Sequence, residues 1–568
     1  MERLPAPDGA GKRHPRAPEG AGPGEVRGGC DRCAPVDPCG FGRQAQRLPK
    51  QAVRRPAAAH GDRPGAGHVA GIHAVRRGDL GPRPPAGGRG AGHAQDAGRG
   101  RDHDDLRHPR DGLRPRRLGP RRLLPQGRDG RNRDAGADLR PPAEPRNTEI
   151  PVERPLTPKP VVPDVLVIGA GVVGLSAAVA AQARGLSVRV IDREGPAAGA
   201  SAGNAGGLAF TEILPLASPK IIRQAPKWLL DPLGPLSLPP SYAPTLLPWL
   251  WRFWRASWPA NFRAATTAQA ALMRHCAGAI GPFLDREGLA GMMTRNGQLQ
   301  LYESRAEYEA SKPFWEISRR EGIEHHPVEG AGISEIQPGI SARFTHGVFS
   351  PGWHGVTDPM DYTLALADRV RARGGEIVVA EAAALVPGGV ETSTGRMDAT
   401  RVVLAAGAFS HRIARTAGAA IPLETERGYN TTLPGDAFDV RLHITFAGHG
   451  FVVANLASGI RVGGAVELGG LDLPPNYARA EAMLTKAARF LPGLKTTGGR
   501  QWMGFRPSLP DSLPAIGPLP GRGDVICAFG HGHLGLTQSA GTGEIVADLL
   551  TGRAPPVDLA PFAPGRFG

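Results

Sequence analysis

Three glycines and two polar residues carry the spacing of a nucleotide-binding site. Gly169, Gly171 and Gly174 form a GxGxxG pattern, and Asp192 and Arg193 follow it farther along the chain. In such a pattern the first glycine allows a tight turn, the second lets the backbone approach a pyrophosphate, and the third lets a helix pack against a strand. The helix start presents free N–H groups to phosphates, and the aspartate accepts hydrogen bonds from a ribose. These residues predict a dinucleotide site.

The elements expected around these residues fit that prediction. Residues 165–168 make a short apolar run, which is typical of a buried parallel strand. An Ala-rich helix then runs to Arg184, where Gly185 can end it, and a second strand covers residues 187–191. The alternative is a transmembrane helix, because residues 165–183 carry no charge. The glycine spacing and the immediate return to a strand favour the nucleotide-binding unit.

Three further glycine-rich segments could border the same site. SAGNAGG, residues 201–207, has small residues that permit close approach to a ligand, although it could also be a mere turn. RVVLAAGAFS, residues 401–410, reads as an apolar strand that stops at Gly407, and ligands sit at such strand ends in doubly wound folds. Residues 524–552 repeat the plan of strand, glycine turn and helix, and we expect the helix to start near Thr537 and to aim its N–H groups into the cleft.

The body of the chain has room for two domains that share a cleft. Residues 163–567 have an ordinary globular composition. Within them we expect a helix to end near Gly374 and a strand to begin at Glu376. ERGYNTTLP, residues 426–434, and GIRVGGAVELGG, residues 459–470, read as antiparallel strands of a substrate-side sheet.

The first 150 residues differ from the rest. They hold 30 Lys and Arg against 18 Asp and Glu, and Phe41 is their one aromatic residue. So little apolar surface cannot offset the entropy of ordering a chain, so we expect a disordered leader. It could bind nucleic acid, but it lacks aromatics that would stack bases; it is too long, Pro-rich and acid-containing for a transit peptide. We favour a third interpretation, a GC-rich gene read upstream of its true start or out of frame.

Cysteine usage indicates neither a zinc site nor a disulfide framework. Cys30, Cys33 and Cys39 lie in the leader near several histidines, but no second pair stands at zinc-finger spacing, so we expect no metal. Cys276 and Cys527 are far apart in the sequence. This pattern fits a protein of a reducing cytoplasm.

A Trp-rich segment, residues 246–258, has a surface or a packing role. Its apolar residues share one helical face with Arg252 and Arg255 beside it. These apolar residues are Leu247, Leu250, Trp251, Trp254 and Trp258. Such a helix could lie on a membrane surface, with tryptophans in the interface and arginines at lipid phosphates. Packing inside a substrate domain is the alternative that we favour.

Several of these segments together resemble a known family. The glycine pattern, the strand ending in AAGAFS, GFRPSLPDSLPAIGP at residues 504–518 and GHGHLGLTQSAGTG at residues 530–543 are similar to motifs of the FAD-dependent D-amino-acid oxidase-like family. Within it they most resemble the bacterial D-amino acid dehydrogenases. The resemblance runs from about Asp164 to the C-terminus, and the leader has no counterpart. It implies an α/β fold, with a Rossmann-type FAD-binding domain and an interleaved α+β substrate domain built on an antiparallel sheet.

The resemblance also implies a domain order. After a leader at residues 1–160, the FAD-binding domain would comprise residues 161–220, 346–420 and 501–568, and the substrate domain residues 221–345 and 421–500.

Site residues follow from the same resemblance. Arg506 would bind the substrate carboxylate, since a guanidinium matches a carboxylate bidentately and stays charged, although it could instead pair with Asp511. Tyr429 and His533 would border the cleft, where either could orient the amine; the alternatives are a strand-packing tyrosine and a turn histidine. N–H groups of residues 534–537 would stabilise negative charge on the flavin. The residues implied to hold FAD are Gly169, Gly171, Gly174, Asp192, Arg193, Ser201, Asn204, Gly407, Gly532, Leu534, Gly535, Leu536 and Thr537.

The implied reaction is the oxidation of a D-amino acid, with a cyclic substrate such as a D-proline derivative as one candidate. With its carboxylate clamped, the substrate passes a hydride to flavin N5, and the imino acid hydrolyses to a 2-oxo acid and ammonia. No second GxGxxG follows a strand, so we expect electrons to go to a quinone or another carrier and not to NAD(P)H. Alternatives are a glycine or sarcosine oxidase that uses oxygen, and a non-catalytic FAD subunit of a larger dehydrogenase. A membrane-bound Trp-rich helix would place the protein at the inner face of the cytoplasmic membrane.

Overall fold

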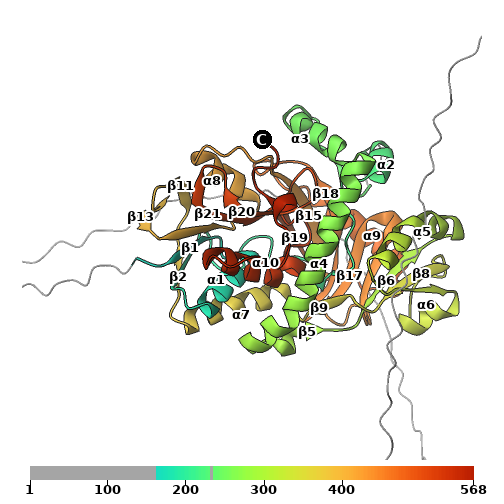
Figure 1. Ribbon diagram of the computed structural model, residues 1–568. Helices are drawn as coiled ribbons and strands as arrows, with labels where there is room; N and C mark the ends of the chain where they lie inside the picture. Colours follow the sequence, from blue (N-terminus) through green and yellow to red (C-terminus); the bar gives the residue numbers. More distant parts are fainter. Residues whose placement is uncertain (1–161, 230–233) are drawn as a thin grey trace, which may run out of the picture. The chain divides into compact units, whose positions relative to one another are not determined.

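The computed structural model describes residues 162–229 and 234–568 (Figure 1). The predictions for the leader, with its three cysteines, lie outside the described residues. Within them no helix is both long and apolar enough to cross a membrane, and residues 165–183 form a strand and a separate helix.

A six-stranded sheet forms the centre of the nucleotide-binding part. Five of its strands are parallel, and the sixth closes one edge as an antiparallel hairpin partner. In spatial order the strands are β10 (Glu376–Val379), β2 (Val188–Asp192), β1 (Val165–Ile168), β14 (Arg401–Leu404), β21 (Arg522–Phe529) and β20 (Ala515–Leu519).

Strand β1 is buried on both faces, which explains its unbroken apolar run. Val165 and Val167 pack into a core with four helices, and Leu166 and Ile168 pack into a second core on the other side. The helices of the first core are α1 (Val172–Ala183), α4 (Pro259–Glu287), α7 (Pro359–Ala372) and α10 (Gly535–Leu550). The second core is covered by α8 (Ser410–Thr416) and by a small sheet of β11 (Ala382–Val386), β12 (Gly389–Thr392) and β13 (Gly395–Asp398).

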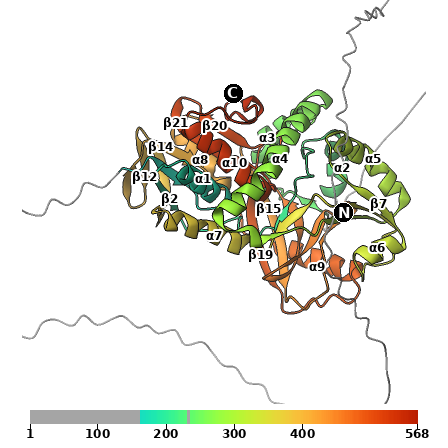
Figure 2. The same cartoon turned by 60° about the horizontal axis from the view of Figure 1, so that its bottom comes forward.

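A larger, mostly antiparallel sheet forms the second part of the molecule (Figure 2). Its strands are, in spatial order, β19 (Arg500–Ser508), β15 (Glu424–Leu433), β18 (Gly459–Glu467), β17 (Phe451–Leu456), β16 (His443–Phe446), β6 (Gln298–Tyr302), β8 (His346–Ser350) and β7 (His326–Glu329), with β4 (Leu236–Ser237) beside β18. Helices α5 (Arg305–Arg320), α6 (Ala331–Ile336) and α9 (Ala478–Phe490) accompany it.

The remaining elements belong to neither of these two sheets. They are β3 (Gly207–Leu208), β9 (His354–Val356) and β5 (Met293–Thr294), which form a small sheet, helices α2 (Pro219–Leu229) and α3 (Ala243–Ala256), and 3-10 turns η1 (Ala290–Met292), η2 (Gly407–Phe409), η3 (Ala447–His449) and η4 (Ala560–Phe562).

The predicted fold class is confirmed, with a Rossmann-type sheet and an interleaved antiparallel sheet. The two predicted antiparallel segments pair as β15 and β18, and the expected strand begins at Glu376. Two strands fall outside the predicted domain boundaries: β8 and β19 were assigned to the FAD-binding domain and pair in the larger sheet. The chain crosses between the sheets inside these segments, and the partners that a strand takes depend on tertiary structure.

Helices α1 and α10 pack in direct contact because glycines line their crossing. A Cβ atom at Gly543 would lie 2.7 Å from the carbonyl oxygen of Ser176 in α1, and one at Gly541 would lie 2.5 Å from Sγ of Cys276 in α4. Both distances are shorter than carbon–oxygen or carbon–sulfur contact permits. The glycines therefore set how close the three helices come.

We expect Gly543→Ala to lower the free energy of unfolding by about 1–3 kcal/mol, because the added methyl group meets a backbone carbonyl that cannot move freely. Gly278→Ala is the matched control, since Gly278 is an exposed position of α4 with open space around it. It should be neutral or stabilise by up to about 1 kcal/mol. Thermal and denaturant unfolding of both variants check this, and equal stability of the two would contradict it.

Candidate active site

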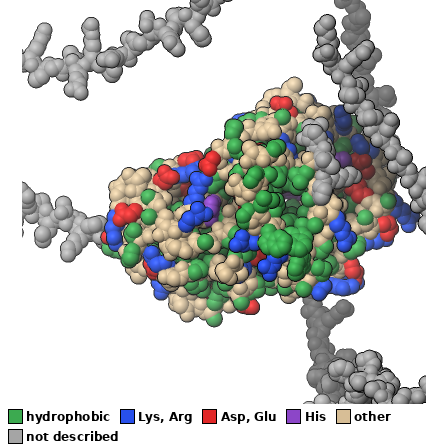
Figure 3. Space-filling view, turned by 90° about the horizontal axis from the view of Figure 1, so that it is seen from above, with side chains coloured by type: hydrophobic (Ala, Val, Ile, Leu, Met, Phe, Trp, Pro, Cys, Tyr) green, Lys and Arg blue, Asp and Glu red, His purple; other side chains and the backbone are tan. Residues whose placement is uncertain are grey.

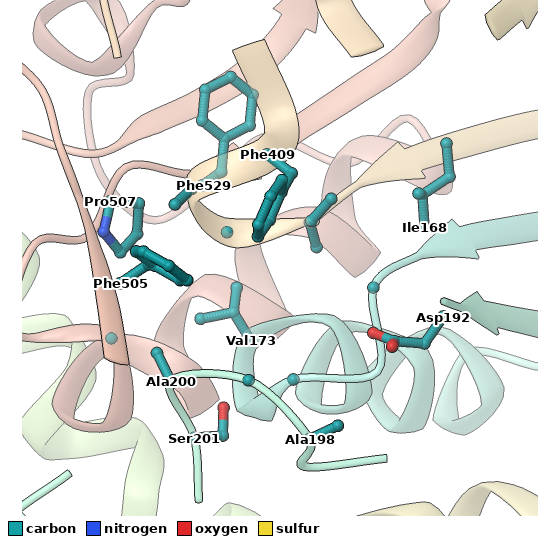
Figure 4. A pocket seen from close by; sticks show the side chains of 18 of the residues that line it. Ile168, Val173, Asp192, Ala198, Ala200, Ser201, Phe409, Phe505, Pro507 and Phe529 are labelled. Atoms are coloured by element: carbon teal, nitrogen blue, oxygen red, sulfur yellow. The ribbon is translucent and has the colours of Figure 1, made fainter. Parts of the chain in front are cut away.

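A cavity of about 810 Å³ opens where the two sheets meet. Its walls come from the ends of β1, β2 and β14, the starts of α1 and α10, and the edge strand β19. Figure 4 shows the aromatic side chains of Phe409, Phe505 and Phe529 on one side of it and Asp192 and Ser201 on the other. It therefore lies at the carboxyl ends of parallel strands, where doubly wound folds bind ligands.

The glycine turn after β1 leaves backbone exposed to this cavity. Gly169 has a φ of 109°, and a Cβ atom there would lie 2.3 Å from the carbonyl oxygen of Ala405. A Cβ atom at Gly174 would lie 2.0 Å from the carbonyl oxygen of Gly169. Gly171 caps the start of α1, and the Val172 N–H donates to Oγ of Ser201 at 2.9 Å. The start of α1 lines the cavity, with the positive end of the helix toward it.

Asp192 fixes the edge of the cavity through its own backbone. Its carboxylate accepts from the N–H of Ala170 at 2.9 Å, and from those of Glu194 and Gly195 at 2.9 and 3.0 Å. A carboxylate has about four acceptor positions, so one remains for a ribose hydroxyl.

Arg193 lines the cavity beside Asp192. Its guanidinium carbon lies 3.9 Å from the centre of the Phe409 ring, in a cation–π arrangement.

The loop of small residues at 201–207 lines the cavity and also makes room for a protein side chain. Asn204 bonds within the loop, accepting from the Gly206 N–H at 2.8 Å, and lines the cavity. A Cβ atom at Gly203 would lie 2.3 Å from the ring of Trp502, so this glycine makes room for the indole. Sequence reasoning assigned the small residues to a ligand and missed Trp502, which also lines the cavity.

Some of the residues that the sequence predicts at the C-terminal turn line the cavity, and others do not. Gly532, His533, Gly535 and Leu536 line it. Leu534 is buried and is not among the lining residues. Thr537 also lies behind the wall, where its Oγ1 accepts from the Ala209 N–H at 2.9 Å. Helix α10 begins at Gly535, two residues before the expected start.

Arg506 lies in the cavity wall on strand β19. It does not pair with Asp511, which instead binds Arg566 at 2.7 Å. Its guanidinium nitrogens donate to the carbonyl oxygens of Gly464 and Ala465 at 3.3 Å, and none of the described carboxylates forms an ion pair with it. The guanidinium can therefore receive a carboxylate from the cavity.

Two residues that sequence reasoning missed hold Arg506 in place. Gly428 on β15 lies under the guanidinium, since a Cβ atom there would be 2.4 Å from Nη2. Glu426 faces Arg506 directly across the strand pair and accepts from Oγ of Ser508 at 2.6 Å. Burial raises the pKa of Glu426, and the charge of Arg506 opposes this. Both residues stand in the segment ERGYN, which the sequence analysis singled out for Tyr429, but only the pairing of β15 with β19 places them beside Arg506.

Two histidines of the turn are held neutral. Burial lowers the pKa of His531 to about 3, and its Nε2 lies 3.1 Å from Oγ1 of Thr542. The side chain of His533 is exposed to the cavity, and desolvation by the cavity walls and the nearby charge of Arg506 lower its pKa to about 4. A neutral imidazole beside Arg506 can accept a hydrogen bond from a bound ammonium or amine.

The structure does not bring Tyr429 to the cavity. Its side chain is buried, and its hydroxyl donates to Glu467 and accepts from the Asn476 N–H at 3.0 Å. Neighbouring residues of a strand point to opposite faces, so Gly428 faces Arg506 and Tyr429 faces the core behind the sheet. Tyr429 is therefore a packing residue of strand β15, which was the alternative to a role in the cleft.

Most of the described chain matches a known family. Residues 164–549 match the family described as FAD dependent oxidoreductase, or DAO. The chain belongs to this family. As a DAO-family protein it is an FAD-dependent oxidoreductase, and the glycine turn, the start of α1 and the cavity fit that cofactor.

The match to this chain covers nearly the full length of its curated relatives. A D-amino-acid oxidase of Bradyrhizobium diazoefficiens is 35% identical over 71% of this chain and 98% of its own. A D-amino acid dehydrogenase of Paramagnetospirillum magneticum is 31% identical over the same shares. Among solved structures, glycine oxidase from Geobacillus kaustophilus superposes with a TM-score of 0.57 at 20% identity, covering 71% of this chain and 98% of that one. The structural match shows the DAO fold.

Most predicted site residues of this DAO-family chain meet at one cavity. Twelve of the sixteen line it, and Gly174, Leu534, Thr537 and Tyr429 do not. Gly174 and Thr537 support the turns that do line it, through the contacts described above. The individual roles of all these residues stay predictions.

We expect the protein to lose stability as the pH falls below about 6.5, because the unfolded chain then binds a proton at His531 that the folded state does not take up until its pKa of about 3. Stability should be complete above that range, and about 2 kcal/mol should be lost by about pH 5 through this group. His531→Gln should flatten the dependence of the unfolding temperature on pH. His326→Gln, at an exposed histidine, is the control and should keep it; equal slopes would refute the assignment.

Proposed function

We propose that the protein oxidises the bond between the α-carbon and nitrogen of a D-amino acid. The substrate loses a hydride and a proton to become an imino acid, which water then converts to a 2-oxo acid and ammonia. Bound FAD supplies the two-electron acceptor. The D-amino acid oxidase and dehydrogenase names of the relatives support this substrate class.

The observation that carries the proposal is the placement of Arg506. It is a buried cation in the cavity wall that pairs with none of the described carboxylates, and it faces a cavity whose other end has the features of a nucleotide site. Glu426 lies across the strand pair but forms no ion pair with this guanidinium, so a substrate carboxylate in the cavity would supply a direct partner. His533 lines the same cavity as Arg506, which supports a role for both groups at the substrate.

Reduced cofactor would pass its electrons to a quinone or another carrier. The dehydrogenase name of one group of relatives supports this acceptor. Oxygen is the second candidate, because the relative at 35% identity is named an oxidase.

The test is an anaerobic titration of the full-length holoenzyme with D-amino acids, their L-enantiomers, glycine, sarcosine and D-hydroxyproline, followed by the visible absorbance of the flavin. We expect bleaching by D-amino acids, and readmission of oxygen or a quinone then identifies the acceptor. Bleaching by glycine or sarcosine alone would replace the proposal with an amine oxidase. Bound FAD that no amino acid bleaches would replace it with a non-catalytic subunit.

Arg506→Lys should retain FAD and raise the substrate KM by roughly a hundredfold, because an ammonium replaces a bidentate fork and leaves a short side chain in the wall. Arg522→Lys, in a pair with Asp524 on the β20–β21 hairpin, is the matched control. Steady-state kinetics and flavin content check the expectation. An unchanged KM in Arg506→Lys would remove this arginine from the substrate site.

Gly428→Ala should raise KM by about tenfold or more with FAD content unchanged, since its methyl group would displace the guanidinium. Gly435→Ala, at a position with no atom near its absent Cβ, is the control and should behave as the unsubstituted protein. A normal KM in Gly428→Ala would show that the guanidinium position is not what limits binding.

A further inference from the structure

Helix α3 and the residue that precedes α4 turn four large apolar side chains to the outside. Leu246 and Trp249 of this helix pack into a small core with Leu468. The opposite side exposes Leu247 (61%), Trp251 (59%), Trp254 (39%) and Trp258 (46%). Packing inside the domain therefore accounts for the inner side of α3 and not for its exposed outer side.

These exposed side chains form one continuous patch, which we call the tryptophan patch. The rings of Trp251 and Trp254 lie 4.9 Å apart, and those of Trp254 and Trp258 lie 5.1 Å apart although Trp258 is beyond the end of α3. Helix α3 stands at the top of Figure 1, and Figure 3 looks at that face and shows hydrophobic side chains gathered in its middle with Lys and Arg beside them. A contiguous patch of tryptophans open to water marks a binding surface.

The charge around the tryptophan patch is one-sided. Residues 246–263, which carry the patch, hold three Arg and no Asp or Glu. Arg252, Arg255 and Arg263 are exposed, and the described residues offer them no recorded ion pair. Positive side chains around an apolar centre complement anionic phosphate groups above a hydrocarbon layer.

Other occupants of the patch meet like charge. A second copy related by two-fold symmetry would place the same surface on both sides, so arginines would face arginines. The first 150 residues of this chain are also basic, with 30 Lys and Arg against 18 Asp and Glu. Neither offers the negative charge that the patch lacks.

We propose that the tryptophan patch docks the protein on the surface of a bilayer that contains anionic phospholipids. Tryptophan rings prefer the level of the headgroups, where one side of the ring is apolar and the indole N–H stays hydrated. The long stems of Arg252 and Arg255 reach phosphates from beside the helix. Binding itself does not depend on the proposed reaction.

The test uses the full-length holoenzyme with no substrate. Flotation with vesicles of phosphatidylcholine and phosphatidylglycerol in equal amounts should recover the protein, and vesicles of phosphatidylcholine alone should recover much less. Brominated lipid chains should quench tryptophan fluorescence in the bound state. The first 150 residues contain no Trp, so quenching cannot arise from that segment.

Two double variants address the two components of the surface. Trp251→Ser with Trp254→Ser removes apolar contact, and Arg252→Glu with Arg255→Glu reverses charge. Each should lower vesicle binding by roughly tenfold or more while flavin content and circular dichroism stay unchanged. The matched control, Arg305→Glu with Arg489→Glu, makes the same charge change on α5 and α9 and should bind normally.

Three outcomes would overturn the proposal. One is the absence of binding to either vesicle. Another is normal vesicle binding by both patch variants, which would assign binding to another part of the chain. The third is a dimer in light scattering that Trp251→Ser with Trp254→Ser dissociates, which would show that a second copy covers the patch.

Discussion

Close approach of backbone to backbone, allowed by glycine, is the constraint on which the rest of the structure depends. Gly174 lets α1 rest on the turn that ends β1, and Gly543 lets α10 lie against α1. Larger residues at these positions would push the helices apart. Because both helices begin at the cavity, their separation decides how two sets of free N–H groups converge on one ligand.

A second contact joins the two sheets at the same place. Ser508, at the end of β19, pairs with His531 of the C-terminal turn, and the N–H of Gly532 donates to the carbonyl oxygen of Pro507 at 2.7 Å. The strand that carries Arg506 is therefore tied by its backbone to the turn that precedes α10. Arg506 therefore keeps a fixed position relative to the turn before α10, and the proposed catalysis by positioning would require this.

The electrostatics of the cavity follow from burial. Desolvation keeps His531 and His533 neutral, while Arg506 stays charged because a guanidinium does not release its proton in proteins. Glu426 lies behind Arg506 and balances part of that charge without closing the cavity. The outer surface has a different charge pattern, with unpaired arginines around exposed tryptophans on α3.

The sequence by itself determined the features that are local. The spacing of Gly169, Gly171 and Gly174 specifies a strand, a turn and a helix because each glycine acts within a few residues. Tertiary structure decided which neighbours those elements meet. It turned Gly428 and not Tyr429 toward Arg506, and it placed β19 in the larger sheet, because a strand offers two faces and two edges and only its partners choose among them. It also left the tryptophan patch of α3 outside, since helical spacing defines an apolar face without saying what covers it.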